Sequence, residues 1–594
     1  MPTRNNRTPN RGLASALVGR RGAPHLRLRV GFVLIAMVLS LYGGRLLQLQ
    51  GVDPGAYAAR AAAESRVTVP LAARRGEILD RYGEPLATSV DGLSIAADPA
   101  LTRAVAPELA TFFATRLNVD YFTLLKRLRG DGRFAFVARQ VPATLANDVV
   151  REAKAAGYEG IYTELDPVRD YPAHDVAANV VGFMGQDKAY AGLELAFDKW
   201  LSGTNGEEEF VLVSGGNRLP LGESSITEPI DGRDLSLTID RDLQWYTQRV
   251  LRTSVRETRA DSGTAVVMDT RTGEVLSLAD YPTFDAASPD LAPAADRGSR
   301  GLSNVYEPGS VQKVLTVAAL LDARKVSPRT RIRVPGTLTR SDEVLNDWWD
   351  HSTLRLTMAG VIAKSSNIGT VLAADHLTAG QLRNYLVRFG LGSRTDSGAW
   401  KESSGILPTR SMWTQLTKDR ITFGQSVSVN ALQMAAAVNT VANDGVRVSP
   451  SLIRGSATND AGTTFGTGVS QSDRIISERA ARQTAKVMER VLDPVAGVAP
   501  GAAVPGYRVA GKTGTAQRAV RGTYAGNGTV VSFAGFAPAD DPRFTVYVVL
   551  NRPRVTGGGG SLAGPVFAKL MSHVLLRYGV PPTGTAPSRL PVEW

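Results

Sequence analysis

Three short stretches of the sequence carry side chains that together could perform acyl transfer. Ser310 and Lys313 are three positions apart, residues 365–367 read Ser-Ser-Asn, and residues 512–515 read Lys-Thr-Gly-Thr. A serine hydroxyl is a weak nucleophile unless a basic side chain lies within hydrogen-bonding reach. Residues i and i+3 share one face of a helix, so the Lys313 amine can reach the Ser310 hydroxyl. The three stretches therefore predict a serine nucleophile with a lysine base.

The third stretch also fits a competing motif, the loop that binds nucleotide phosphates. Gly506, four further residues and then Gly511-Lys512-Thr513 match the pattern G-x-x-x-x-G-K-[ST]. Such a loop must bend tightly and open into a helix whose N-terminus receives the phosphate. Here the four inner residues, Tyr-Arg-Val-Ala, favour a strand, and the glycine-rich sequence that follows disfavours a helix. The sequence therefore favours an acyl transferase over an ATPase.

Each stretch needs an element of structure that holds it in place. Residues 307–309 read Glu-Pro-Gly, and a helix-forming run follows at residues 312–325. Proline and glycine ahead of Ser310 suit a helix start, whose partial positive charge favours a developing alkoxide. Ser365 lies between apolar segments, and Lys512 is expected at the end of a strand. Each motif alone is weak, but three in this order predict one site.

The composition excludes several other kinds of chemistry. The chain has no cysteine, which excludes disulfides, thiol nucleophiles and cysteine-bound metals. It has five histidines, none paired at metal-ligand spacing, so a histidine metal site or a Ser-His-Asp triad is disfavoured. Lys313 is therefore the candidate base, and no metal or cofactor is expected.

The N-terminal segment predicts a membrane anchor. Residues 1–29 contain seven arginines and no acid, so this basic tail carries seven of the twelve net positive charges. The apolar run at residues 30–44 continues in further leucines, and a span over residues 30–50 could cross a bilayer. The positive-inside rule places the tail in the cytoplasm and the rest of the chain outside. The alternative is a signal peptide cleaved near Ala56-Tyr57-Ala58.

Several longer stretches match the sequence markers of one protein family. Residues 75–83 read R-G-E-I-L-D-R-Y-G, residues 169–172 read R-D-Y-P, and residues 192–194 read G-L-E. They resemble markers of the N-terminal module of class B penicillin-binding proteins, with Tyr82 where that family usually has asparagine. Further stretches resemble the transpeptidase domain of the same family: residues 263–285, 421–445 and 531–553. The chain is most similar to the division-specific FtsI type, or penicillin-binding protein 3.

The resemblance implies a fold and a division into domains. At 594 residues and 43% hydrophobic content the chain is long enough for two or three cores. We expect a single transmembrane helix and then an extended, mixed N-terminal module at residues 51–230, of the pedestal or dimerisation type. An α/β (α+β) serine acyl-transferase domain, with an antiparallel sheet flanked by helices, should follow at residues 231–594. Three markers of the N-terminal module are expected to be salt-bridge and fold determinants: Arg75, Asp80 and Glu194.

The resemblance also implies a reaction for the catalytic residues. Ser310 would attack the carbonyl between two terminal D-alanines of a peptidoglycan stem peptide, and the amine of a neighbouring stem would then take the acyl group. Lys313 can act as base only if burial and a nearby cation such as Lys512 favour its neutral form. Ser365 would relay a proton to the leaving amine, and Asn367 would orient the substrate amide and Lys313.

The remaining site residues are implied to bind the substrate. The terminal carboxylate would be received at the third motif, and Gly514 would permit close approach of the backbone. The backbone N–H groups of Ser310 and Thr515 would form the oxyanion hole. A β-lactam mimics the same carboxylate and carbonyl, so it should acylate Ser310 and stay. The substrate-binding set is thus Lys512, Thr513, Gly514 and Thr515.

Alternatives remain at this point. A serine β-lactamase or D,D-carboxypeptidase uses the same three motifs but sends the acyl group to water, and a division scaffold or β-lactam sensor would keep the fold without turnover. No glycosyltransferase signature is found within residues 51–230. The expected partners, by resemblance, are peptidoglycan stem peptides, β-lactam inhibitors, membrane lipid, an FtsW-type glycan polymerase and other divisome proteins, with no nucleic acid. Septal cell-wall synthesis is the expected setting.

Overall fold

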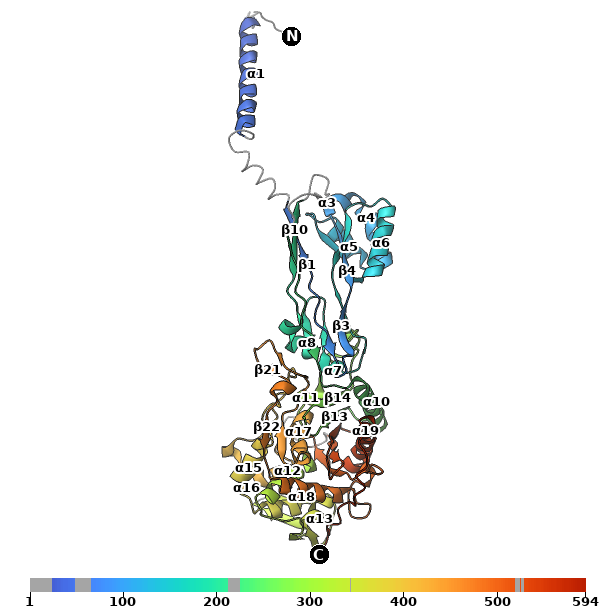
Figure 1. Ribbon diagram of the computed structural model, residues 1–594, viewed down its shortest axis with the longest axis vertical. Helices are drawn as coiled ribbons and strands as arrows, with labels where there is room; N and C mark the ends of the chain where they lie inside the picture. The colour runs from blue at the N-terminus through green and yellow to red at the C-terminus, as the bar shows by residue number, and fades with distance from the viewer. Residues whose placement is uncertain (1–23, 49–65, 212–224, 342, 519–523, 525–527) are drawn as a thin grey trace, which may run out of the picture. The chain divides into compact units, whose positions relative to one another are not determined.

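A computed structural model of the chain describes residues 24–48, 66–211, 225–341, 343–518, 524 and 528–594 (Figure 1). Most of the predicted basic tail and the alternative cleavage site near Ala56 lie outside these residues. The chain divides into two compact units, one of residues 1–70 with 207–228 and one of residues 71–206 with 229–594. Each unit is described by itself.

The first unit contains the candidate anchor. Helix α1 (Pro24–Leu47) begins before the predicted residue 30, because a first-turn proline and the leucines and arginines that follow it favour a helix. The stretch His25–Leu47 has 23 residues and none of its apolar window is buried. By length and composition it is a candidate membrane span. The same unit holds a three-stranded sheet, β1-β10-β11, formed by Arg66–Leu71, Gly206–Val211 and Ser225–Thr227.

The second unit begins with two small sheets. The first, in the order β12-β2-β3-β7, consists of Leu235–Ser236, Ile78–Leu79, Pro85–Val90 and Val168–Asp170. The second, in the order β5-β4-β6, consists of Ala135–Pro142, Gly92–Ala97 and Ile161–Leu165. Helices α4 (Ala106–Leu117) and α6 (Ala143–Ala155) supply Leu109, Phe113 and Val149 to a small core of their own on this second sheet. The predicted mixed N-terminal module is built this way.

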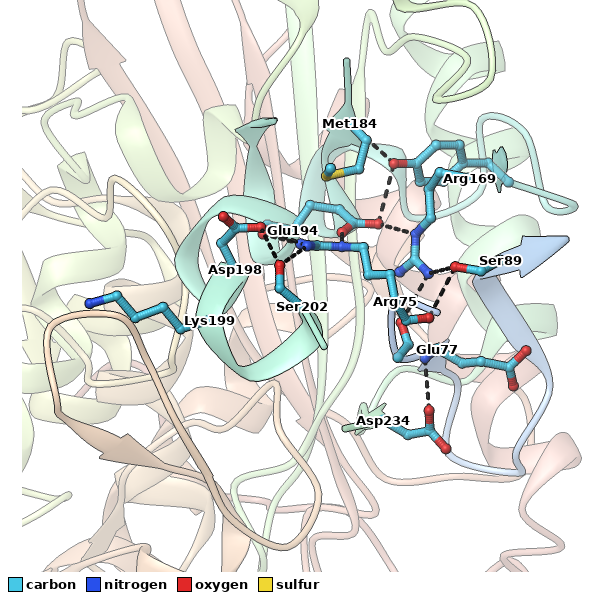
Figure 2. Close-up of polar contacts among 12 residues, drawn as sticks. Arg75, Glu77, Ser89, Arg169, Met184, Glu194, Asp198, Lys199, Ser202 and Asp234 are labelled. Atoms are coloured by element: carbon cyan, nitrogen blue, oxygen red, sulfur yellow. Dashed lines mark hydrogen bonds and ion pairs between the residues drawn. The ribbon is translucent and has the colours of Figure 1, made fainter. Parts of the chain in front are cut away.

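A buried ion network holds this N-terminal part together (Figure 2). The Glu194 carboxylate, with its side chain fully buried, lies 2.7 Å from Arg75 Nε and 2.7 Å from Arg169 Nε. Arg75 also reaches Asp198 at 2.6 Å, and the hydroxyl of Tyr171 donates to Glu194 at 3.2 Å. The structure thus places Arg75 and Glu194 in internal ion pairs, as expected of them.

Asp80, the third expected fold determinant, acts differently from the other two. Its carboxylate accepts hydrogen bonds from the backbone N–H groups of Tyr82 at 2.8 Å, Glu84 at 2.9 Å and Arg241 at 3.2 Å. A short polar side chain that accepts from nearby backbone groups fixes a turn. Asp80 therefore holds a turn and the start of α10 (Arg241–Thr258) rather than forming a salt bridge.

The C-terminal part of the second unit is built on one antiparallel sheet of five strands. The order is β14-β13-β25-β24-β23, formed by Val275–Tyr281, Ser262–Asp269, Phe544–Asn551, Thr529–Ala537 and Ala510–Gln517. The central strands are buried at almost every position, so both faces of the sheet are covered. Helices α10 and α19 (Gly564–Arg577) pack on the sheet and on each other, and α17 (Ala431–Ala442) packs on β13 and β25. The predicted antiparallel sheet flanked by helices is confirmed.

The competing nucleotide-binding interpretation is wrong, because Lys512 lies inside a strand. Residues 510–517 form β23, an edge strand that pairs only with β24, and the described residues between these two strands form no helix. Lys512 was expected at the end of a strand, yet it is the third residue of this one. A turn at residues 505–507 postpones the start of the strand, so the whole Lys-Thr-Gly-Thr motif lies along the sheet edge.

Candidate active site

The candidate nucleophile lies in a short turn that leads into a buried helix. Gly309–Val311 form a 3-10 turn, η5, and α12 (Gln312–Asp322) continues from it. Ser310 was expected at the start of a helix, and it lies in the 3-10 turn that leads into α12; Gly309, which opens this turn, has a φ of +54°. Ser310 is half-buried and Lys313, one turn later, is fully buried. The turn therefore presents the hydroxyl toward solvent and the amine toward the domain interior.

Close backbone packing holds this turn in position. The N–H of Gly309 donates to the carbonyl of Gly424 at 3.1 Å. A Cβ atom added to Gly424 would lie 2.0 Å from the carbonyl oxygen of Gly309, which no real side chain tolerates. Only a glycine at position 424 lets the two segments approach this closely.

The Ser-Ser-Asn motif forms the loop between α13 (Met358–Ala363) and α14 (Asn367–Ala374), here called the S-x-N loop (residues 364–367). Ser366 caps α14, because its hydroxyl accepts the N–H of Gly369 at 2.8 Å. Ser365 has a φ of +59°, in the left-handed region that a serine seldom adopts. The cap and this backbone conformation fix the positions of the Ser365 hydroxyl and the Asn367 amide.

Both candidate lysines reach this loop. Lys313 Nζ lies 2.6 Å from the carbonyl oxygen of Ser365, 2.8 Å from Asn367 Oδ1 and 3.5 Å from Ser365 Oγ. Lys512 Nζ lies 2.8 Å from Ser365 Oγ, 3.0 Å from Thr513 Oγ1 and 3.1 Å from the carbonyl oxygen of Thr513. The structure thus brings residues from α12, the S-x-N loop and β23 together around one serine.

The environment of the two amines favours their neutral forms. Burial lowers the pKa of Lys313 to about 7, although the carboxylate of Asp347 acts in the opposite direction. The pKa of Lys512 lies well below its usual value, first because of burial and then because of the charge of Lys313. Among the described residues, neither amine has a carboxylate within ion-pair distance. A neutral amine with a free lone pair is what a general base requires.

The Ser310 hydroxyl forms no hydrogen bond with any other described residue. The Lys313 amine is engaged by Ser365 and Asn367 instead. The predicted Ser310–Lys313 hydrogen bond is therefore not made in this arrangement, although both side chains come from the same turn of chain. Catalytic hydrogen bonds often tighten only when the substrate is bound.

The third motif lines the open edge of the sheet beside the nucleophile. A Cβ atom added to Gly309 would lie 3.0 Å from the carbonyl oxygen of Thr515, and one added to Gly514 would lie 2.9 Å from that of Pro308. The turn that carries Ser310 and strand β23 are therefore in contact. Thr513 is buried, whereas Thr515 is exposed and its hydroxyl accepts the N–H of Gly559 at 3.2 Å. The backbone of Ser310 and that of Thr515 meet at one place.

Sequence reasoning missed Asp347, which organises the S-x-N loop from outside the three motifs. Its buried carboxylate accepts the N–H groups of Asn367 and, at 3.1 Å, of Ile368, together with the hydroxyl of Ser366 at 2.7 Å. His351 Nε2 lies 3.0 Å from the same carboxylate. The only signal in the sequence is an aspartate and a histidine four positions apart, ahead of the motif.

A pocket lies between the segment that precedes the nucleophile in sequence and the end of β23, and none of the candidate catalytic residues lines it. Its volume is about 550 Å³, and its walls include Tyr306, Glu307, Gln517 and Arg518. Burial raises the pKa of Glu307, whose carboxylate accepts the N–H of Ser426 at 2.8 Å and the hydroxyl of Tyr524 at 2.8 Å. Among the described residues, no group of three histidine, aspartate or glutamate side chains could hold a metal ion.

Comparison with known families and proteins gives consistent matches over most of the chain. The family described as "Penicillin binding protein transpeptidase domain" matches residues 263–572, and "Penicillin-binding Protein dimerisation domain" matches residues 70–237. Penicillin-binding protein PbpB of Mycolicibacterium smegmatis is 34% identical over 97% of this chain and 94% of its own length. Peptidoglycan D,D-transpeptidase FtsI of Escherichia coli is 32% identical over 93% of this chain and 92% of its own.

Solved structures give the same result. Penicillin-binding protein 3 of Mycobacterium tuberculosis, in complex with aztreonam, has a TM-score of 0.69 and 28% identity, covering 89% of this chain and all of that one. A peptidoglycan synthetase of Bifidobacterium adolescentis has a TM-score of 0.71 and 31% identity, covering 89% of this chain. The fold over 89% of this chain is therefore similar to that of experimentally determined structures.

Proposed function

The chain belongs to the class B penicillin-binding proteins, and we propose that it is a serine-type peptidoglycan D,D-transpeptidase inhibited by β-lactams. One observation carries the proposal. Two buried lysines, Lys313 and Lys512, share contacts with Ser365 beside the half-buried Ser310, and burial favours the neutral form of both amines. This arrangement supplies a nucleophile, a base and a proton relay without histidine or metal.

The proposed first half-reaction forms an acyl-enzyme. The oxygen of Ser310 attacks the carbonyl between the two terminal D-alanines while neutral Lys313 takes the hydroxyl proton. The tetrahedral oxyanion is bound by the backbone N–H groups of Ser310 and Thr515, and each such donor is worth about 3 kcal/mol of barrier. The C–N bond then breaks, and D-alanine leaves after its nitrogen receives the proton through Ser365.

The proposed second half-reaction completes the cross-link. The amine of another stem peptide attacks the ester carbonyl of the acyl-enzyme, loses a proton to the same lysine, and releases Ser310 as the hydroxyl. Asn367 holds the substrate amide, while Lys512, Thr513 and Thr515 bind the terminal carboxylate. A carboxylate beside Lys512 favours the charged form of that amine. The change from free to bound substrate therefore alters the electrostatics next to Lys313.

The cellular setting is also part of the proposal. Helix α1 would anchor the chain once in the cytoplasmic membrane, with the arginine-rich end inside and the transpeptidase domain, residues 231–594, outside. The pedestal module at residues 51–230 and the anchor would contact an FtsW-type glycan polymerase and other divisome proteins. The proposed role in septal wall synthesis rests only on the similarity to FtsI.

The decisive experiment is covalent labelling. The full-length protein in detergent is incubated with a fluorescent penicillin, digested and mapped by mass spectrometry, beside Ser310→Ala. A stable adduct on the Ser310 peptide, absent from the variant, is expected. An adduct elsewhere means that the nucleophile is wrong. Rapid turnover of the penicillin would instead favour a β-lactamase or carboxypeptidase, and a folded wild-type protein without adduct would favour a scaffold.

A further inference from the structure

A buried aspartate–histidine pair lies directly behind the S-x-N loop. Asp347 follows β17 (Glu343–Asn346), which forms a hairpin with β16 (Thr337–Arg340), and its side chain is fully buried. The side chain of His351 is 4% exposed, and its Nε2 lies 3.0 Å from Asp347 Oδ2. Neither residue belongs to the three motifs, and neither touches the nucleophile.

His351 is held by two oxygen atoms. Its Nδ1 lies 2.6 Å from the carbonyl oxygen of Ser352, and its Nε2 lies 3.0 Å from the Asp347 carboxylate. The imidazole ring therefore helps to hold this carboxylate in place.

The carboxylate of Asp347 holds the C-terminal end of the S-x-N loop. One oxygen accepts the backbone N–H groups of Asn367 and Ile368, and the other accepts the hydroxyl of Ser366. The segment before it adds a further contact, because the amide of Asn367 donates to the carbonyl oxygen of Asn346 at 3.0 Å. This leaves Asn367 Oδ1 directed at Lys313 Nζ, 2.8 Å away.

We infer that Asp347 and His351 are positioning residues of the proposed acyl transfer: Asp347 orients the S-x-N loop and supplies a negative field at Lys313, and His351 holds the Asp347 carboxylate in place. This inference rests on the proposed function and adds to it a control over the base. Asp347 raises the pKa of Lys313 against the effect of burial. Among the described contacts, His351 reaches the S-x-N loop only through that carboxylate.

The other charged groups around Lys313 are few, which makes the inference testable. Lys512 on β23 faces it across Ser365. Helices α13 and α14 contain no charged residue. Lys364, just before Ser365, is directed to Glu593 at 3.6 Å. Asp347 is thus the carboxylate whose field acts on Lys313 from this side of the site.

The test measures how the rate of acylation by a fluorescent penicillin depends on pH. The full-length protein is labelled, and the reaction is stopped after a series of times. Asp347→Asn should move the acidic limb of the rate profile to lower pH, because Lys313 loses the carboxylate that favours its charged form. His351→Gln, which keeps a donor for Asp347, should leave the limb in place, whereas His351→Ala, which removes the donor, should lower the plateau rate. Asp350→Asn, an exposed carboxylate in the same segment, should leave the limb in place.

A shift to lower pH in Asp347→Asn establishes the inference, and about a tenfold fall in its plateau rate would report the loss of loop positioning. No shift in Asp347→Asn, or equal plateau rates in His351→Ala and His351→Gln, would overturn it and leave the pair a purely structural role. If Asp347→Asn does not fold by circular dichroism, the comparison of His351→Ala with His351→Gln decides. Failure of the proposed function is distinct, since the wild-type protein itself would then not be acylated.

Discussion

Two buried clusters of basic side chains in this protein differ in how their charges are matched. In the N-terminal module, Arg75 and Arg169 both contact the buried carboxylate of Glu194 (Figure 2). In the candidate active site, Lys313 and Lys512 contact only carbonyl, amide and hydroxyl oxygens. The first cluster keeps its charges in the interior, whereas the second favours loss of a proton.

The difference teaches how one chain separates a structural site from a reactive one. Guanidinium groups stay protonated, so a buried arginine needs a partner, and a carboxylate supplies it. Lysine shifts its pKa readily when it is buried without one. The choice of arginine with glutamate in one place, and of lysine with neutral oxygens in the other, therefore predicts which substitutions affect stability and which affect chemistry.

The largest effect on the acylation rate is expected when one of the two active-site lysines is replaced by a residue that always carries a charge. Lys313→Arg should lower the rate of penicillin acylation about 10³-fold or more, since a guanidinium cannot accept the serine proton and general-base catalysis is worth about 10²–10⁴. The rate is measured by gel fluorescence over time. Lys325→Arg, at an exposed lysine beyond the same helix, is the matched control. Near-normal acylation by Lys313→Arg would remove this lysine from the role of base.

Breaking the ion network around Glu194 should affect stability instead of the acylation rate. Glu194→Gln leaves Arg169 without its counter-charge and Arg75 with Asp198 alone, and removal of one partner from a buried ion pair costs about 3–5 kcal/mol. The expected result is a lower free energy of unfolding in urea, with an unchanged acylation rate per folded molecule below the transition. A variant of normal stability that no longer reacted with penicillin would contradict the separation between the two clusters.

The pH profile of the wild-type protein should show an intermediate effect. Acylation requires the neutral amine of Lys313, whose pKa is lowered to about 7, so the rate should fall about tenfold per pH unit below that value. Labelling at a series of pH values on either side of neutrality measures the limb. A flat profile through neutral pH would mean that another group takes the proton.

The lowered pKa of Lys313 also predicts how the free energy of unfolding depends on pH. An unfolded lysine has a pKa of about 10.4, above the folded value, so the unfolded chain binds more protons between the two values. The contribution of Lys313 to the free energy of unfolding therefore rises with pH from about 7 upward and is absent at lower pH. Urea unfolding of wild type and Lys313→Met across this interval isolates the contribution, and parallel curves would contradict it.

The smallest effect is expected at an exposed pair. Arg151 and Asp148 form an ion pair at 2.5 Å in which the side chains are 75% and 56% exposed. Because solvent and salt screen such a pair, Arg151→Ala should change the free energy of unfolding by less than about 1 kcal/mol and leave acylation unchanged. A larger loss of stability would mean that charge matching matters at the surface as much as it does around Glu194.

Part of this site could be predicted from the sequence, because its chemistry is local. The spacing of Ser310 and Lys313 predicts that the two residues lie on one turn of chain. The Lys-Thr-Gly-Thr motif identifies Lys512 as a candidate site residue. The contact of Lys512 with Ser365 depends on which strand forms the sheet edge, and that in turn depends on the pairing of β23 with β24. The role of each of these residues in catalysis stays a prediction until the labelling experiment is done.

Other parts could not be predicted from the sequence, because they depend on distant segments. Asp347 reaches the S-x-N loop only because the hairpin of β16 and β17 packs beside α14. The left-handed backbone of Ser365 has no sequence signal, since serine seldom adopts it. The order of the domains could be predicted from the resemblance, whereas the late start of β23 depends on a turn at residues 505–507 whose type single residues do not determine.

The contact between Gly309 and Gly424 has an evolutionary consequence. A side chain at position 424 would overlap the backbone that carries the nucleophile, so substitutions there are removed by selection before they can alter reactivity. The same holds for any change that displaces the turn by the width of a methyl group. A lineage exposed to β-lactams therefore has few viable routes at the nucleophile itself. Heritable resistance in this chain should accumulate in the residues that surround the turn, such as those supporting the S-x-N loop.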